Sequence, residues 1–263
     1  GDGERLRALG VDVVHHAPDV GEHLQDHILC KVVYATQPEN SINREVQGLR
    51  LIPAALRWFF LREGPLTTGS APVGAFCHTR DGLEAPDVQI HFASGGTLYN
   101  EAGKIRALKQ PAVTAVVNQS RPESRGSIHA KSKDIAEAPV IAANYLSSQL
   151  DRVTLLRGMR ILLNIFDLPE VQPYLNGRLS PDIETDISDD EALMAYIRRE
   201  ASTVYHPTST CSIGKVVDEN LQVIGIEGLS VIDASVMPYV VSGNTNAATI
   251  MLAEKGADHL LAA

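Results

Sequence analysis

Two polar sites near the end of the chain carry residues that could handle a proton. A histidine lies in Tyr205-His206-Pro207, and an asparagine begins the stretch Asn244-Thr245-Asn246. A neutral imidazole accepts a proton near neutral pH and its charged form stabilises an alkoxide, whereas an amide donates and accepts hydrogen bonds without titrating. Each residue also has a structural interpretation, as a hydrogen-bonding turn residue before proline or as a turn residue or N-cap after Gly243. The residues alone leave both interpretations open.

The segment between these sites indicates how they could meet. Its apolar run, residues 229–235, predicts one buried strand that ends in a turn at Asp233 and Ala234. Residues from 245 onward predict a helix. We therefore expect the histidine, the strand and the asparagine to converge on one place.

The middle of the chain predicts alternating strands and helices. Apolar spacing of three and four predicts helices over 4–9, 42–62, 151–167 and 189–202, while β-branched or alternating runs predict strands over 11–14, 28–34, 88–92, 112–119 and 126–131. Short connections favour antiparallel pairing, and 175–190 is predicted to be a surface loop. Trp58, Phe59 and Phe60 are expected to be core residues rather than an aromatic substrate box.

Composition narrows the class of protein. The chain has 263 residues, 44% of them hydrophobic, which suits one large or two small domains. Its net charge of −9, without a basic run, argues against nucleic acid and anionic membranes as partners. Three widely spaced cysteines suggest neither a disulfide framework nor a thiolate zinc site. With no signal or transmembrane pattern in the sequence, we expect a cytoplasmic location, and the missing start methionine suggests a piece of a longer or processed polypeptide.

Three stretches together resemble the glucose-methanol-choline (GMC) family of FAD-dependent oxidoreductases. They are Gly21-Glu22-His23-Leu24-Gln25-Asp26-His27, Tyr205-His206-Pro207-Thr208-Ser209-Thr210-Cys211, and the span from Val217 through Ile232-Asp233-Ala234-Ser235 to Asn244-Thr245-Asn246. The resemblance covers essentially the whole chain and is most specific after residue 200. It implies an α+β fold, the C-terminal half of a two-domain flavoprotein, with an antiparallel-sheet substrate domain and segments that return to the FAD-binding domain.

The resemblance also implies a domain order. Residues 1–27 would end the FAD-binding domain, 28–202 would form the substrate domain, and 203–263 would return to the FAD-binding domain. The family's glycine-rich dinucleotide loop is missing, because no G-x-G-x-x-G occurs in the chain. We therefore expect FAD to need a missing N-terminal half as a partner.

Site roles follow from the same resemblance. His206 matches the family's active-site histidine and would accept the hydroxyl proton of an alcohol, while Asn244 matches the second active-site position and would orient the oxygen. Asp233 and Ala234 would contact the ribityl and phosphate region of FAD. The N-terminal amides of the helix begun by Thr245 and Asn246 would stabilise the reduced flavin.

The implied reaction oxidises a small alcohol to a carbonyl, with oxygen or a quinone as the electron acceptor. Two alternatives remain: a hydroxynitrile-lyase-like relative that keeps FAD without redox turnover, and a fragment that is inactive without its other half. Metal binding by His23 and His27, four residues apart, is not expected, because no third ligand accompanies them.

Overall fold

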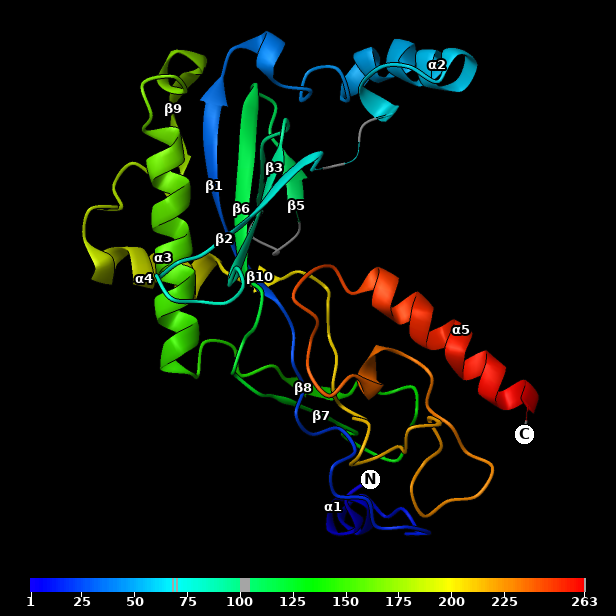
Figure 1. Ribbon diagram of the computed structural model, residues 1–263. Coiled ribbons are helices and arrows are strands. Elements are labelled where there is room, and N and C mark those ends of the chain that lie inside the picture. The colour runs from blue at the N-terminus through cyan, green and yellow to red at the C-terminus, as the bar shows by residue number, and fades with distance from the viewer. Residues whose placement is uncertain (68, 70, 100–104, 263) are drawn as a thin grey trace. The chain divides into compact units, whose positions relative to one another are not determined.

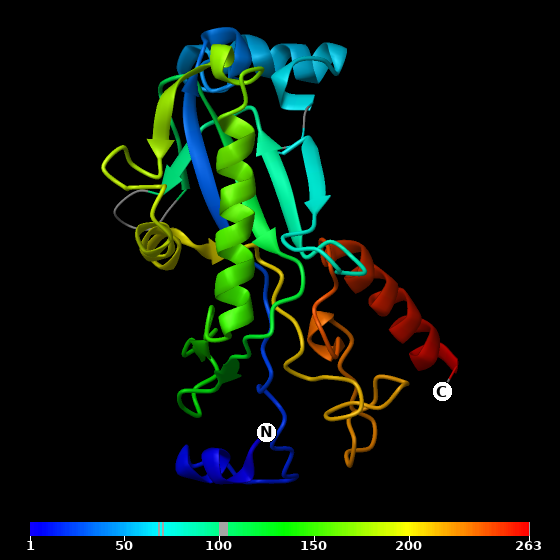
Figure 2. The same cartoon turned by 60° about the vertical axis from the view of Figure 1, so that its left-hand side comes forward.

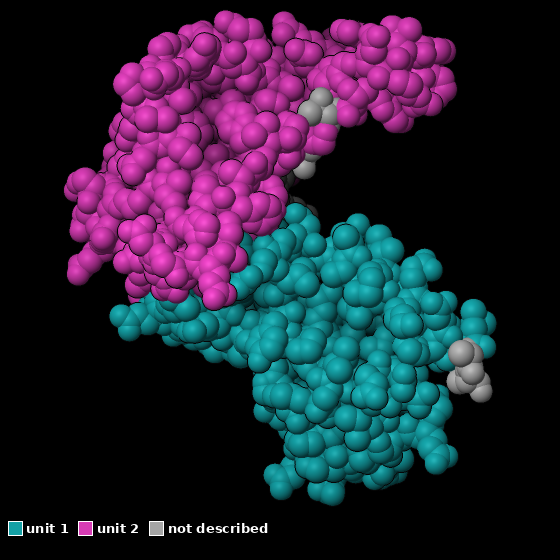
Figure 3. All heavy atoms as spheres, viewed as in Figure 1, with its two compact units in different colours: residues 1–28, 120–152, 203–263 teal, residues 29–119, 153–202 magenta. Residues whose placement is uncertain are grey.

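The structure, a computed structural model, describes residues 1–67, 69, 71–99 and 105–262. The chain forms two compact units (Figure 3). Unit 1 comprises Gly1–Ile28, Ser120–Arg152 and Thr203–Ala263, and unit 2 comprises Leu29–Gln119 and Val153–Ser202. The predicted middle segment, 28–202, is continuous, whereas the structure groups 120–152 with the two chain ends. Assignment of these units to FAD and substrate domains stays a prediction.

The element order is mixed, as the α+β prediction requires (Figure 1). The helices are α1 (Gly3–Ala8), α2 (Leu51–Leu61), α3 (Gln149–Phe166), α4 (Asp190–Glu200) and α5 (Asn246–Ala262), with short 3₁₀ turns η1 (Pro38–Asn40), η2 (Gly48–Arg50), η3 (Pro65–Thr67), η4 (Gln172–Tyr174) and η5 (Ala234–Val236). The strands are β1 (Ile28–Thr36), β2 (Val73–Cys77), β3 (Val88–Ala93), β4 (Thr97–Tyr99), β5 (Ile105–Ala107), β6 (Ala112–Gln119), β7 (Ser127–His129), β8 (Val140–Ala142), β9 (Leu175–Ser180) and β10 (Ser202–Thr203).

Unit 2 is built on an antiparallel sheet of order β10-β1-β6-β3-β2, with β9 also paired to β1. In its centre, Val32 lies opposite Ala115 and Ile90 lies opposite Val117. Strands β1 and β6 are buried along almost their whole length, which explains why both read as continuous runs of β-branched and small residues. The predicted strands 28–34, 88–92 and 112–119 are confirmed.

Helix α3 packs along one face of this sheet (Figure 2). Leu155, Met159 and Leu162 recur on one side of the helix and are almost completely buried. At the end of the helix, Phe166 stacks on Tyr34 of β1, with ring centroids 4.4 Å apart. The helical spacing of the sequence therefore predicted the helix, but not its buried face: Ile165, one of the apolar residues with that spacing, is 41% exposed.

Helix α2 contradicts one expectation. Trp58, Phe59 and Phe60 are 41%, 61% and 71% exposed, so the prediction that they are core residues is wrong. The helix buries only Ala54. Apolar spacing identifies a helix that has an apolar stripe, but it does not say which surface, if any, covers that stripe.

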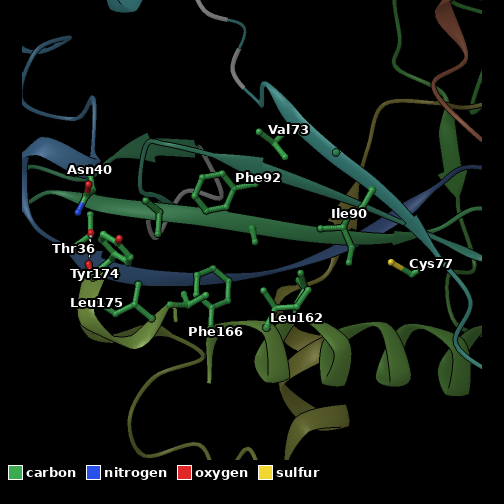
Figure 4. A pocket seen from close by; sticks show the side chains of 16 residues that line it. Thr36, Asn40, Val73, Cys77, Ile90, Phe92, Leu162, Phe166, Tyr174 and Leu175 are labelled. Carbon is green, nitrogen blue, oxygen red and sulfur yellow. Dashed lines mark hydrogen bonds between the residues drawn. The ribbon is translucent and has the colours of Figure 1, made fainter. Parts of the chain in front are cut away.

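An apolar pocket of about 550 Å³ lies in unit 2 between the sheet and α3. Ile90 and Phe92 line it from β3, and Leu162 and Phe166 line it from α3 (Figure 4). None of the predicted site residues lies here, since all of them belong to unit 1.

Unit 1 contains little regular structure around a small core. The core consists of Val216, Val217, Leu221, Val223 and Val236, against which Leu252 of α5 packs. The predicted strand over 229–235 is wrong: a single bridge joins Ser230 to Gln222, and the 3₁₀ turn η5 follows. The apolar run packs on this core through side chains, without a neighbouring strand to form a ladder.

Two further local predictions fail. Residues 11–14 form no strand, and Val14 is 95% exposed. Conversely, the predicted loop 175–190 begins with β9, where Ser180 pairs with Val33 of β1. Among the described helices, none is both long and apolar enough to cross a membrane.

Candidate active site

The segment 21–27 is anchored in unit 1 by two glycines that no larger residue could replace. Leu24 and Gly126 exchange backbone hydrogen bonds of 2.9 Å in both directions. A Cβ on Gly126 would lie 2.2 Å from the Ala142 carbonyl oxygen, and one on Gly21, whose φ is +86°, would lie 2.1 Å from the Ile128 carbonyl oxygen. Close backbone approach therefore sets the path of the segment that follows.

Gln25 joins this segment to three other stretches of unit 1. Its backbone N–H donates to Thr208 (3.1 Å), and the Thr208 N–H donates back to the Gln25 carbonyl (2.8 Å). Its side-chain Nε2 donates to the Pro122 carbonyl (2.6 Å), and its Oε1 accepts from the Val240 N–H (3.0 Å). The side chain is 3% exposed, so these bonds replace the water that its amide would otherwise bind.

Asp26 holds the backbone of the candidate histidine. Its Oδ1 accepts from the His206 N–H (2.8 Å), and its Oδ2 accepts from the Tyr145 hydroxyl and the Thr203 hydroxyl, each at 2.5 Å. Burial, together with the bond to Asp26, raises the pKa of Tyr145, which therefore stays a donor. Three donors from two stretches of the chain, residue 145 and residues 203–206, thus converge on one carboxylate.

His206 lies in a loop with unusual backbone geometry. Tyr205 before it and Ser209 after it have φ of 62° and 78°, a region that residues other than glycine seldom adopt. The bonds of Thr208 and of the His206 N–H hold the loop in this form. Such conformations persist where the surroundings determine them and occur often at functional sites.

The ring of His206 contacts a second histidine. Nδ1 of His206 lies 2.9 Å from Nδ1 of His27, and the two rings meet edge to face with centroids 5.2 Å apart. His27 is completely buried, and its Nε2 lies 3.2 Å from the Ser120 carbonyl oxygen. Burial is the main cause that lowers the pKa of His27.

Four of the other predicted residues meet His206 at a pocket of about 430 Å³. Its lining consists of Tyr205, His206, Pro207, Ala234, Asn244, Thr245, Asn246 and Thr249. Five of the six predicted site residues therefore share one pocket. Asp233 does not line it; its carboxylate accepts from the Ser235 N–H (2.7 Å) and caps η5, the turn that presents Ala234.

Helix α5 starts at this pocket. The Thr245 carbonyl accepts the N–H of Thr249 (2.9 Å), which makes Thr245 the residue that precedes the first turn beginning at Asn246. Amides of a first helical turn have no acceptor inside the helix and give this end a partial positive charge. Among the described residues, those that line the pocket include no acidic side chain, so the pocket suits an anionic group.

Sequence reasoning missed His27, Tyr145 and Thr203. The available signal was the adjacency of Asp26 and His27 in one of the three motifs, but the site residues were expected only after residue 200. The four-residue spacing of His23 and His27 would suit a metal on a helix, but the structure assigns no helix to residues 21–27. His23 instead contacts Asp19 (2.7 Å) and Lys215 (2.8 Å).

Comparisons with known proteins agree with the proposed resemblance. A sequence model described as GMC oxidoreductase matches residues 122–253. An oxygen-dependent choline dehydrogenase of Xanthomonas euvesicatoria is 38% identical over 97% of this chain and 46% of its own length. One of Pseudomonas aeruginosa is 36% identical over 97% of this chain and 45% of its own length. The chain thus spans about half the length of these relatives.

Solved structures show the same fold at lower identity. A formate oxidase, 22% identical, matches all of this chain and 50% of its own with a TM-score of 0.88. A fungal aryl-alcohol oxidase, 23% identical, matches 98% of this chain and 51% of its own with a TM-score of 0.78. The α+β architecture is therefore that of the C-terminal half of these flavoproteins.

Proposed function

Because this chain belongs to the GMC oxidoreductase family, we propose that it supplies the proton-handling wall of an FAD-dependent enzyme that oxidises an alcohol to a carbonyl. One observation carries the proposal: His206 and Asn244 line the same pocket as the N-terminus of α5. A proton acceptor, a neutral hydrogen-bonding amide and a partially positive helix end are the groups that alcohol oxidation by a flavin requires.

The residues present fit part of an FAD. Ala234, Thr245 and Asn246 would contact the cofactor. Asp233 would hold Ala234 in place by capping η5, the turn that begins at Ala234. The first-turn amides of α5 suit the negative charge of a reduced flavin. The pyrophosphate would be held by the half of the relatives that this chain does not cover, since the chain contains no G-x-G-x-x-G.

The chemistry divides between two residues. Conversion of CH–OH to C=O removes a proton from oxygen and a hydride from carbon; FAD supplies the hydride acceptor when bound. The imidazole of His206 takes the proton. The amide of Asn244 holds the substrate oxygen, because it can donate to an alcohol or alkoxide oxygen without changing charge.

The names of the relatives indicate which substrate to test first. Choline-like alcohols are the first substrates to test, because the two relatives compared above are named choline dehydrogenases. Either oxygen or a quinone would reoxidise the flavin, and the N-terminal half would be the main partner. A cytoplasmic location stays a prediction.

The experiment measures, by flavin absorbance, the anaerobic reduction by choline of the FAD-loaded enzyme, in which this chain is joined to the N-terminal half that it does not cover. We expect His206→Ala to slow reduction by about a hundredfold to ten-thousandfold while FAD stays bound, the range for a positioned base. His259→Ala, on α5 but outside the pocket lining, is the matched control. An unchanged rate of flavin reduction in His206→Ala would contradict the proposal. Release of an aldehyde from a hydroxynitrile, without bleaching of the flavin, would indicate a lyase.

A further inference from the structure

The residue that the proposed reaction does not use is His27. It is 0% exposed and does not line the pocket, yet its Nδ1 lies 2.9 Å from Nδ1 of His206. A buried histidine pair of this kind must share its protons in a defined way, because two N–H groups or two lone pairs cannot face each other at this distance.

The Ser120 carbonyl decides the protonation of His27. A carbonyl oxygen can only accept, so the contact of 3.2 Å requires the N–H of His27 to be on Nε2. Burial is the main cause that lowers the pKa of His27, and the charge of His206 lowers it further. The Ser120 carbonyl, the Asp26 charge and the Val241 backbone act in the opposite direction. A neutral His27 with its proton on Nε2 has a lone pair on Nδ1.

The lone pair on His27 decides the tautomer of His206. Since Nδ1 of His27 accepts, Nδ1 of His206 must carry the proton that lies between them. In a neutral ring the other nitrogen, Nε2, is then the one that can accept a proton. We propose that His27 is a positioning residue that holds His206 in the Nδ1–H tautomer and so makes Nε2 its proton-accepting atom.

The neighbouring Asp26 completes this arrangement by holding the backbone of His206. Its Oδ1 is bonded to the backbone N–H of His206, and its Oδ2 is bonded to Tyr145 and Thr203. Two consecutive residues therefore hold both the backbone and the ring of His206. A carboxylate in the place of His27 would orient the ring equally well but would add a negative charge beside it; neutral His27 orients it without that charge.

The role in the reaction rests on the proposed function, whereas the tautomer can be tested without it. Asparagine at position 27 places its amide oxygen where the ring carries Nδ1, so His27→Asn keeps an acceptor for His206. Glutamine reaches the position of Nε2, so His27→Gln keeps a donor for the Ser120 carbonyl and removes the acceptor. The two variants form a matched pair of similar polarity.

The direct readout is the ¹⁵N spectrum of histidine-labelled protein, in which His206 is assigned by its loss in His206→Ala. We expect the Nδ1–H tautomer in the wild type and in His27→Asn, and the Nε2–H tautomer in His27→Gln. An Nε2–H tautomer in the wild type overturns the proposal even if no variant folds. An unchanged tautomer in His27→Gln overturns it as well.

Kinetics of the FAD-loaded protein test the role in the reaction. We expect His27→Gln to lower kcat by about tenfold, the factor for one hydrogen bond of typical net strength, while His27→Asn stays within about threefold. KM should not change, because His27 does not line the pocket. If the tautomers are as expected but kcat is unchanged in His27→Gln, the role of His27 in the reaction is wrong. If flavin reduction is undiminished in His206→Ala, the proposed function itself is wrong.

Discussion

The carboxylate of Asp26 allows a prediction whose size can be worked out from the structure. It accepts the N–H of His206 and the hydroxyls of Tyr145 and Thr203. Removing it by Asp26→Ala leaves three donors without this acceptor. A buried donor left unsatisfied costs about 1–3 kcal/mol. All three bonds are only partly buried, so the low end, about 1 kcal/mol, applies to each donor. We therefore expect Asp26→Ala to lower the free energy of unfolding by about 3 kcal/mol.

The variant Asp26→Asn separates the acceptor from the charge. The remaining oxygen of the substituted side chain can still accept the backbone N–H of His206, which can only donate. Its amide nitrogen replaces Oδ2 and can donate to the hydroxyls of Tyr145 and Thr203, because hydroxyl groups rotate and accept as well as donate. We therefore expect Asp26→Asn to cost about 1 kcal/mol, the net value of the charge-assisted part of these bonds.

Two assays check this pair. Urea unfolding measures the free energy, and hydrogen exchange at the His206 amide measures the single bond to Oδ1, which should open in Asp26→Ala and persist in Asp26→Asn. Asp218→Ala is the control, because Asp218 also accepts backbone N–H groups, from Asn220 and Gln222, but in an exposed turn. Equal costs for Asp26→Ala and Asp26→Asn, or a cost no larger than that of Asp218→Ala, would refute the reasoning.

Two further predictions concern pH and packing. Since burial lowers the pKa of His27 from its usual 6.5, the unfolded chain binds a proton that the folded chain does not, and stability should fall as the pH drops through 6.5. His27→Asn should lose less stability over this range in urea titrations; an identical pH dependence would count against the buried neutral ring. In α3, Gly158→Ala should destabilise by about 1–3 kcal/mol despite its better helix propensity, because the added Cβ would lie 2.8 Å from Val117. Thermal unfolding checks this, and an increase in Tm would contradict it.

Long periodic elements were the predictable part of the fold. Helix α3 and the central strands β1, β3 and β6 formed where spacing and β-branched residues predicted them, since their side chains are buried against one another within unit 2. Short apolar runs were less informative. Residues 229–235 have the composition of a strand, but a strand needs a partner for its backbone, and the turns around them provide only single bridges.

The exposed side chains of α2 show a second limit. Phe59 and Phe60 have the spacing and size of core residues, yet both are more than half exposed. Apolar spacing is a property of one element, whereas burial is a property of two surfaces in contact. The sequence therefore predicts the helix, but it does not predict whether another surface packs against its apolar side chains.

For the candidate site, the sequence supplied the residues to which the family resemblance assigns the reaction: an imidazole at His206, an amide at Asn244 and a helix that begins after them. Only the tertiary structure decided how they are held. The contact of His27 with His206 joins residues 179 positions apart, and that of Asp26 joins residues 180 apart. A motif records residue types and local spacing, but the tautomer of a ring depends on which atoms face it in space.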